Sequence, residues 1–212
     1  MDDPQAASAP AAERLRLTEI FCSLQGEARA AGWPTVFVRL TGCPLRCQYC
    51  DTAYAFHGGQ WWETDAILAE VASHGARHVC VTGGEPLAQK RCLQLLAKLC
   101  DAGYSVSLET SGAIDIAGVD PRVSRVLDIK TPDSAEVERN LWDNLSLLTP
   151  RDQVKFVICS RADFDWAKDV VAEHRLHEVC DVLFSPSASQ LPARELADWI
   201  VAGKLPVRFQ MQ

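Results

Sequence analysis

The sequence predicts an α/β fold in which a partial (β/α)6-type parallel barrel forms a single domain. The length of 212 residues suits one domain with a large core and is short for two. Runs rich in β-branched residues alternate in regular order with segments of helical periodicity. Strand, crossover helix and strand in this order give right-handed βαβ units, and about six strands suit an open barrel better than a closed eight-stranded one.

The predicted elements follow one another along the whole chain. Strands are predicted at residues 35–40, 77–84, 104–110, 124–130, 153–159, 180–186 and 205–210. Helices are predicted at residues 66–74 (capped by Thr64 or Asp65), 88–102, 162–175 and 193–202. The inward face of the second helix is assigned to Leu93, Leu96, Ala97 and Cys100. The inward face of the last helix is assigned to Leu196, Trp199 and Ile200.

Five polar motifs come directly after predicted strands. They are GCPLRCQYC (42–50), TGGEP (82–86), ETSG (109–112), DIKTP (128–132) and SPSAS (185–189). Because the carboxyl ends of parallel strands meet at one edge of a sheet, we expect all five motifs on one rim, where the chemistry of such sheets is found.

Composition and charge exclude several classes of function. Apolar residues make up 48% and charged residues 23%, and the net charge is −7, which argues against a nucleic-acid or anionic-membrane surface. The sequence has no apolar run of membrane-spanning length. Residues 1–14 lack the apolar core of a secretory signal and are interpreted as a disordered Ala/Pro-rich tail, which leaves residues 15–212 as the domain. We therefore expect a cytoplasmic protein.

Nine cysteines are many for a chain of this length. Disulfides are not expected in a reducing compartment, so the number of cysteines favours metal or cluster binding. Six of the cysteines lie mostly within apolar runs and are interpreted as small buried hydrophobic residues: Cys22, Cys80, Cys92, Cys100, Cys159 and Cys180.

The other three cysteines, Cys43, Cys47 and Cys50, share one loop with the spacing C-x3-C-x2-C. A structural zinc site has four protein ligands, and no second cysteine pair follows at a suitable distance, although His57, Asp51 or Cys22 could complete one. A 4Fe–4S cluster on three thiolates leaves one iron free to bind the amine and carboxylate of a methionine-derived cofactor. The missing fourth thiol therefore favours a cluster.

The triad, with Tyr49 before its last cysteine, resembles the signature of radical S-adenosylmethionine (SAM) enzymes. The motif Gly83-Gly84-Glu85-Pro86 resembles their GGEP motif, in which backbone and carboxylate receive the methionine ammonium.

Further segments resemble a narrower family, the 7-carboxy-7-deazaguanine synthases. They are EIFCSLQGE (19–27), PTVFVRLTGCPLRCQYCDT (34–52), TGGEPL (82–87), ETSG (109–112) and KFVI (155–158), and the resemblance covers about residues 15–212. It implies a lyase of queuosine biosynthesis that converts 6-carboxy-5,6,7,8-tetrahydropterin to 7-carboxy-7-deazaguanine with loss of ammonia, after a SAM-derived radical takes hydrogen from pterin C6. The alternatives are an activating enzyme for a glycyl-radical protein and a zinc- or cluster-stabilised binding module.

The resemblance also implies roles for individual residues. Cys43, Cys47 and Cys50 would hold the 4Fe–4S cluster, and Thr52 would bind Mg²⁺. Contacts to SAM would come from Tyr49, Cys50, Asp51, Gly84, Glu85, Glu109, Asp128, Ile129, Lys130, Ser185, Pro186, Ser187 and Ala188. Contacts to the pterin substrate would come from Leu24, Gln25, Gly26, Arg39 and Thr82. The implied partners are a flavodoxin-like or ferredoxin-like electron donor and a second copy of the chain in a homodimer.

The sequence departs from the family pattern at Ala28, which replaces the second glycine of QGEG. If this position needs a positive φ, alanine costs about 1 kcal/mol or more there.

Overall fold

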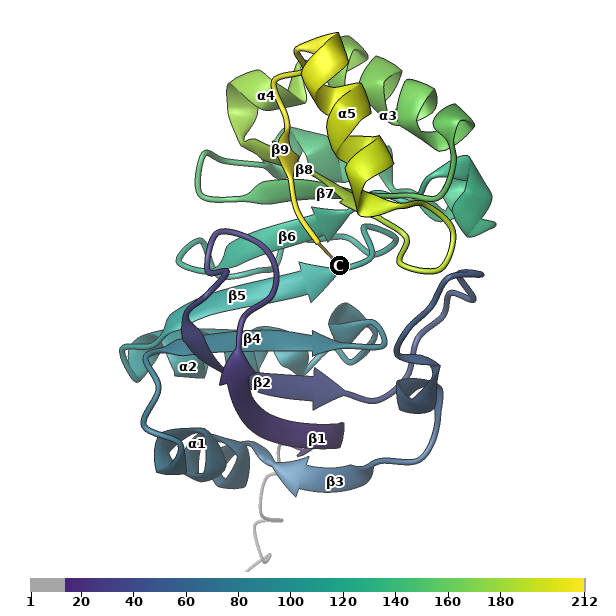
Figure 1. The fold of residues 1–212 in the computed structure, drawn as a ribbon. Helices are drawn as coiled ribbons and strands as arrows, with labels where there is room; N and C mark the ends of the chain where they lie inside the picture. Colours follow the sequence, from purple (N-terminus) through teal and green to yellow (C-terminus); the bar gives the residue numbers. More distant parts are fainter. Residues whose placement is uncertain (1–13, 212) are drawn as a thin grey trace, which may run out of the picture.

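The computed structural model describes residues 14–211 and shows one twisted sheet with helices packed against it (Figure 1). The predicted tail lies outside the described residues except for Arg14, which begins the first strand. Within the described chain the sheet has nine strands in the order β3-β1-β2-β4-β5-β6-β7-β8-β9.

Most of the strands are parallel, which confirms the predicted α/β class. Their bounds are β1 Arg14–Leu24, β2 Pro34–Leu40, β3 Gln60–Glu63, β4 His78–Gly83, β5 Ser105–Thr110, β6 Ser124–Asp128, β7 Gln153–Ile158, β8 Asp181–Pro186 and β9 Arg208–Phe209. From β2 to β9 each neighbour pairs in parallel, whereas β1 is antiparallel to both β2 and β3. The antiparallel pair formed by β1 and β3 was not predicted, and the predicted last strand shrinks to the two residues of β9.

Within residues 14–211, five α-helices connect or follow the strands: α1 Thr64–Ser73, α2 Cys92–Asp101, α3 Arg161–Glu173, α4 Leu176–Val179 and α5 Ala193–Gly203. Short 3-10 turns lie in the loops at η1 Ala53–Phe56, η2 Pro86–Ala88, η3 Pro132–Ser134, η4 Val137–Arg139 and η5 Trp142–Leu147. The predicted caps of α1 are wrong, because Thr64 already belongs to the helix and Glu63 precedes it without a side-chain cap bond.

The buried face of α2 differs from the prediction. Leu96 is buried as expected, but Leu93, Ala97 and Cys100 are only partly buried. The residues that do face the core are Cys92, Leu95, Leu96 and Leu99. Apolar side chains cover most of the circumference of this helix, so the sequence is compatible with either of two neighbouring faces turned toward the core. Packing against the sheet selects one of them. In α5 the prediction holds: Leu196 and Ile200 are buried and Trp199 packs against the core.

The strand β2 shows how the fold separates core from cavity. Val36, Val38 and Leu40 are completely buried on one face, and each contributes about 1.5–3 kcal/mol to folding. Phe37 and Arg39 alternate with them and line a cavity on the opposite face. Because successive side chains of β2 point to opposite faces, this one strand contributes residues both to the core and to the cavity wall.

The scattered cysteines are all free thiols, and four of them are buried as predicted: Cys80, Cys92, Cys159 and Cys180. Cys100 is half-buried, and Cys22 is exposed, so the prediction for Cys22 is wrong. Cys22 lies in the last part of β1, where exposed side chains dominate. None of the helices in residues 14–211 has the length and apolar character needed to cross a bilayer.

Candidate active site

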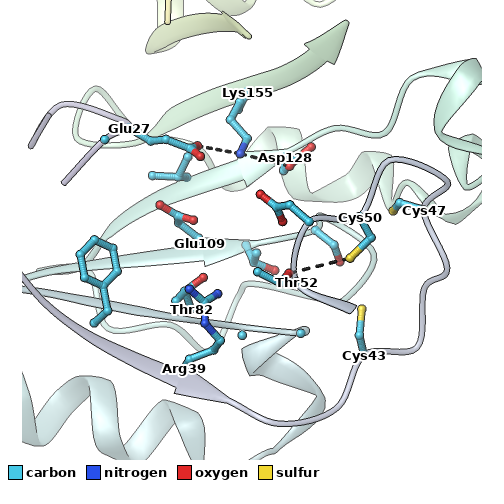
Figure 2. A pocket seen from close by; sticks show the side chains of 18 of the residues that line it. Glu27, Arg39, Cys43, Cys47, Cys50, Thr52, Thr82, Glu109, Asp128 and Lys155 are labelled. Carbon is cyan, nitrogen blue, oxygen red and sulfur yellow. Dashed lines mark hydrogen bonds and ion pairs between the residues drawn. The ribbon is translucent and has the colours of Figure 1, made fainter. Parts of the chain in front are cut away.

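A cavity of about 360 Å³ opens on the inner face of the sheet and receives side chains from β1, β2, β4, β5, β6 and β7 (Figure 2). Three cysteines lie at one end of it, and a group of charged side chains lies at the other. The five motifs at the carboxyl ends of the strands share one rim, as predicted: four of them contribute residues to the cavity. The loop after β8 does not line the cavity but reaches the cysteine loop, where Gln190 Nε2 donates to Gln48 Oε1 at 3.1 Å.

The loop after β2 brings Cys43, Cys47 and Cys50 to the cavity wall. Gly42 has a φ of +101° and turns the chain out of the strand, which a residue with a side chain rarely does. The N–H of Leu45 donates to Cys43 Sγ at 3.4 Å, and Cys50 Sγ lies 3.8 Å from Thr52 Oγ1. The loop is therefore ordered around its thiols by its own short-range contacts.

The donor set fits a cluster better than a single ion. Within residues 14–211, no three His, Cys, Asp or Glu side chains are arranged to hold one metal ion, so the zinc alternative gains no support. Burial raises the pKa of Cys43, and it raises the pKa of Cys47 to about 11. Cys43 and Cys47 are thus protonated near neutral pH, and binding these two thiols to iron would release protons.

The TGGEP turn packs directly against the cysteine loop. A Cβ atom on Gly84 would lie 2.1 Å from the carbonyl oxygen of Gly42, and one on Gly83 would lie 2.8 Å from that of Leu40. The N–H of Glu85 donates to the Gly42 carbonyl at 2.8 Å. Only glycine permits this approach, which leaves Gly83 and Gly84 lining the cavity beside the cysteines.

Glu85 itself does not line the cavity. Its carboxylate is fully buried and accepts bonds from the N–H of Leu87 at 2.9 Å, from Thr110 Oγ1 at 3.0 Å and from the N–H and Oγ of Ser111 at 2.7 and 2.6 Å. These bonds join the TGGEP turn to the ETSG turn. These bonds give the carboxylate an organising role, and its predicted contact with an ammonium group stays a prediction.

A network of charges runs along the cavity wall, from Asp128 and Lys130 near the cysteine end to Lys155 and Glu27. Lys155 Nζ lies 2.8 Å from Glu27 Oε2 and 3.4 Å from Asp128 Oδ2, and Lys130 Nζ lies 3.1 Å from Asp128 Oδ1. Burial opposes the charge on both lysines, but Glu27 and Asp128 outweigh it at Lys155, and Asp128 does so at Lys130, so that both pKa values are raised. Both lysines therefore stay protonated.

Glu109 of β5 lies beside this network and has a raised pKa. Burial, followed by the neighbouring charge of Glu27, raises the pKa of Glu109 to about 7, although Lys155 acts in the opposite direction. Near neutral pH this side chain can therefore present either a donor or an acceptor to a ligand in the cavity.

Arg39 forms another part of the wall. Its Nε donates to Glu19 Oε1 at 2.7 Å, and the same carboxylate oxygen accepts the Tyr54 hydroxyl at 2.8 Å. The guanidinium is thus held in place while its remaining N–H groups stay available for an anion.

The structure brings most of the predicted site residues together. The predicted residues that line the cavity are Leu24, Gln25, Gly26, Arg39, Cys43, Cys47, Tyr49, Cys50, Asp51, Thr52, Thr82, Gly84, Glu109, Asp128 and Lys130. Tyr49 Oη is buried and has no hydrogen-bond partner among the described residues. An unpaired polar atom at this position is a feature expected of a binding site.

Six predicted residues do not line the cavity: Glu85, Ile129, Ser185, Pro186, Ser187 and Ala188. Ile129 packs into the core, and Ser185, Pro186 and Ser187 are buried at the end of β8, whereas Ala188 is exposed.

Sequence reasoning missed several residues of the cavity. Glu27 and Lys155 belong to its charge network, and Phe21 stacks on Phe37 at 5.0 Å in its wall. Lys155 carried a visible signal, because it is the one charged residue in the fully buried strand QVKFVI. A charge in such a strand needs a buried partner.

Comparisons with known proteins agree with this geometry. The radical SAM superfamily profile matches residues 37–182. The 7-carboxy-7-deazaguanine synthase of Chlorobaculum tepidum is 44% identical over 201 residues, which cover 93% of this chain and 91% of that protein. The chain belongs to the 7-carboxy-7-deazaguanine synthase family of radical SAM proteins.

Other members of the family support the assignment. The 7-carboxy-7-deazaguanine synthase of Koribacter versatilis is 39% identical and covers 93% of this chain and 94% of its own length. The crystal structure of QueE from Escherichia coli superimposes with a TM-score of 0.78 over 94% of both chains, at 24% identity, and thereby confirms the fold. Radical SAM chemistry implies a 4Fe–4S cluster and SAM as cofactors.

Proposed function

We propose that this chain converts 6-carboxy-5,6,7,8-tetrahydropterin to 7-carboxy-7-deazaguanine with loss of ammonia. The observation that carries the proposal is one shared cavity, in which three free thiols lie at one end and Arg39, Thr82 and Glu109 lie further in (Figure 2). Gln25 lines the same cavity. A cluster site and a polar pocket for a flat heterocycle would thus be neighbours in one cavity. The cluster and SAM, when bound, supply the radical chemistry.

The residues at the cysteine end would hold the cofactors. Cys43, Cys47 and Cys50 would ligate the cluster, and Gly84 with the backbone near Tyr49 would let SAM approach closely. Asp128 and Lys130 offer an acceptor and a donor on the same wall. Glu85 would act from behind this wall by fixing the Ser111 turn.

The deeper residues would hold the substrate and exclude water. Arg39, already oriented by Glu19, suits the pterin carboxylate as a bidentate partner. Thr82 and the segment Leu24–Gly26 would contact the ring, and Thr52, next to Cys50, would offer its hydroxyl to Mg²⁺ beside the substrate. We further propose a cytoplasmic homodimer that receives electrons from a flavodoxin-like or ferredoxin-like donor.

The test is anaerobic reconstitution with iron and sulfide, reduction, and incubation with SAM and the carboxytetrahydropterin, followed by mass spectrometry. The expected product is 7-carboxy-7-deazaguanine. Formation of 5′-deoxyadenosine without this product would contradict the substrate assignment and leave the radical SAM assignment intact.

Two cysteine variants give a matched comparison. Cys47→Ala should lose both cluster and product, because its thiol lines the cavity. Cys22→Ala should keep both, because Cys22 is exposed on β1. Retained turnover in Cys47→Ala would contradict the ligand assignment.

A further inference from the structure

The loop between β1 and β2, residues 25–33, extends from β1 toward the strands β7 and β8, and we call it the crossing loop (Figure 1). Three successive residues attach it to the far strands. Glu27 pairs with Lys155 of β7 at 2.8 Å, the N–H of Ala28 donates to Gln210 Oε1 at 2.7 Å, and Arg29 Nε donates to Asp181 of β8 at 2.9 Å. The loop also contains Gln25 and Gly26, which line the cavity.

The three attachments differ in their surroundings. The Arg29–Asp181 pair is exposed, and such pairs contribute little. The Glu27–Lys155 pair belongs to the cavity wall itself. The bond between Ala28 and Gln210 is buried at both ends, since Ala28 is 3% and Gln210 9% exposed. A buried N–H that lost this acceptor would have no water to replace it.

Ala28 depends on this bond because of its backbone. Its φ of +61° lies in the left-handed region, which residues with a Cβ atom rarely adopt without support from their surroundings. Gln210 can supply that support, because its own N–H donates to the carbonyl of Phe184 in β8 at 3.0 Å. A residue fixed to the far edge of the sheet therefore holds a strained residue directly after Glu27.

We infer that Gln210 is a positioning residue for substrate binding: through Ala28 it holds Gln25, Gly26 and Glu27 in the conformation that contacts the pterin. The inference rests on the proposed function. Gln210 does not line the cavity, so it would act through the crossing loop alone. Its Nε2 has no hydrogen-bond partner in the described part of the chain, so the acceptor oxygen carries its role here.

The test is Gln210→Met, which keeps the length of the side chain but removes the acceptor. The dissociation constant for the pterin should rise about tenfold, the result of leaving one buried N–H unpaired, while SAM affinity stays unchanged at the cysteine end of the cavity. Amide hydrogen exchange in residues 25–33 should become faster. The control is Gln94→Met on the exposed side of α2, which should change none of these quantities.

A second variant tests the role of the strained backbone. Glycine adopts a φ of +61° readily, so Ala28→Gly combined with Gln210→Met should recover part of the lost pterin affinity. No recovery would overturn the link to Ala28. Unchanged pterin affinity in Gln210→Met, or an equal loss of pterin and SAM affinity, would overturn the inference as a whole.

The hydrogen-exchange measurement needs no turnover. If the unmodified protein did not convert the pterin, the proposed function would fail, but faster exchange confined to residues 25–33 in Gln210→Met would still show that Gln210 holds the crossing loop. Unchanged exchange there would remove that claim independently of the reaction.

Discussion

At the scale of single residues, Glu85 shows how a buried carboxylate can join two turns behind a cavity wall. It accepts bonds from Leu87, Thr110 and Ser111 and is 0% exposed. All of its partners are donors, so the acceptor oxygens of this buried side chain are satisfied. The sequence motif alone cannot reveal this, because it does not show which way the side chain points.

We expect Glu85→Gln to destabilise the protein, since the new amide would direct its N–H₂ group against donors. The free energy of unfolding should fall by about 2–3 kcal/mol, as for a buried hydrogen-bonded group that loses its partner. Urea unfolding of the cluster-free protein measures this. Glu173→Gln, at an exposed position on α3, is the control and should change stability by less than about 0.5 kcal/mol. Equal stability of both variants would contradict the organising role.

The pKa of Glu109 leads to a prediction about pH. Burial raises its pKa from 4.5 to about 7, so ionisation of this residue destabilises the folded state. The contribution of Glu109 to stability is fully present below about pH 4.5 and is lost as the pH rises through about 7. Compared with Glu109→Gln, the native protein should therefore lose about 3 kcal/mol of stability over this range.

Denaturant unfolding of both proteins at several pH values tests this, because most other titrating groups cancel in the difference. If the difference in unfolding free energy between the two proteins did not vary with pH, the pKa of Glu109 would not be raised in the folded state. If the native protein instead gained stability relative to Glu109→Gln as the pH rises, the charge of Lys155 would outweigh the effect of burial on the pKa of Glu109.

At the scale of elements, the cysteine loop is attached to loops from the other side of the sheet through Gln48. Its N–H donates to the carbonyl of Ser134 at 3.1 Å and its Nε2 to that of Asp133 at 2.7 Å. Its Oε1 accepts Gln190 Nε2 at 3.1 Å, and Gln190 Oε1 in turn accepts Ser187 Oγ at 2.9 Å. One glutamine thus links the loops that follow β2, β6 and β8.

We predict that Gln48→Ala weakens SAM binding about fivefold and leaves the iron content unchanged. Gln48 is exposed, so the two lost side-chain bonds together contribute only about 1 kcal/mol. Titration of SAM against the spectrum of the reduced cluster measures the affinity, and Gln94→Ala on α2 is the control. The same SAM affinity in both variants would contradict the prediction.

The elements that the sequence predicts well are those with simple patterns. The strands β2, β4, β5, β6, β7 and β8 are short β-branched runs, and each was predicted to within one or two residues. The strand β1 escaped because its register shifts between Leu17 and Glu19, and a bulge of this kind breaks the alternation. The short strand β3 is mostly exposed, so it carries no burial pattern at all.

The residues of the candidate site also divide into those that the sequence predicts and those that only the folded structure reveals. Cys43, Cys47 and Cys50 were predictable from their spacing, which is a local property, and Gly84 was predictable from the motif TGGEP. The reason why Gly84 must lack a side chain is not local, because it is the carbonyl of Gly42 on another loop. The partnership of Glu27 with Lys155 spans 128 positions in the sequence. No local pattern encodes such a pair, so only the folded chain reveals it.

At the scale of the whole molecule, Lys155 joins parts of the chain that are distant in sequence. It lies directly opposite Asp128 in the pairing of β6 and β7, and it reaches Glu27 on the crossing loop. Glu109 of β5 also contributes to its raised pKa. One ammonium therefore compensates three carboxylates from three elements, in a side chain that is only 7% exposed.

Replacing this ammonium should destabilise the protein in a manner that depends on pH. In Lys155→Met, Glu27 and Glu109 would lose Lys155 as their cation and Asp128 would keep only Lys130, and breaking a buried pair in this way costs about 3–5 kcal/mol near pH 8. Lys155 holds the pKa of Glu109 down, so in the variant that pKa would rise further. Glu109 would then take up a proton as the pH falls toward about 5, and the loss should shrink there.

The matched control is Lys168→Met, because Lys168 pairs with Asp165 at 3.3 Å on the exposed surface of α3. An exposed pair contributes about 0–1 kcal/mol, so this variant should stay close to the native protein at both pH values. Urea unfolding of the cluster-free proteins gives the comparison. If Lys155→Met lost the same stability at about pH 5 and pH 8, the effect would come from packing alone, and the charge network could not be what joins the crossing loop to the sheet.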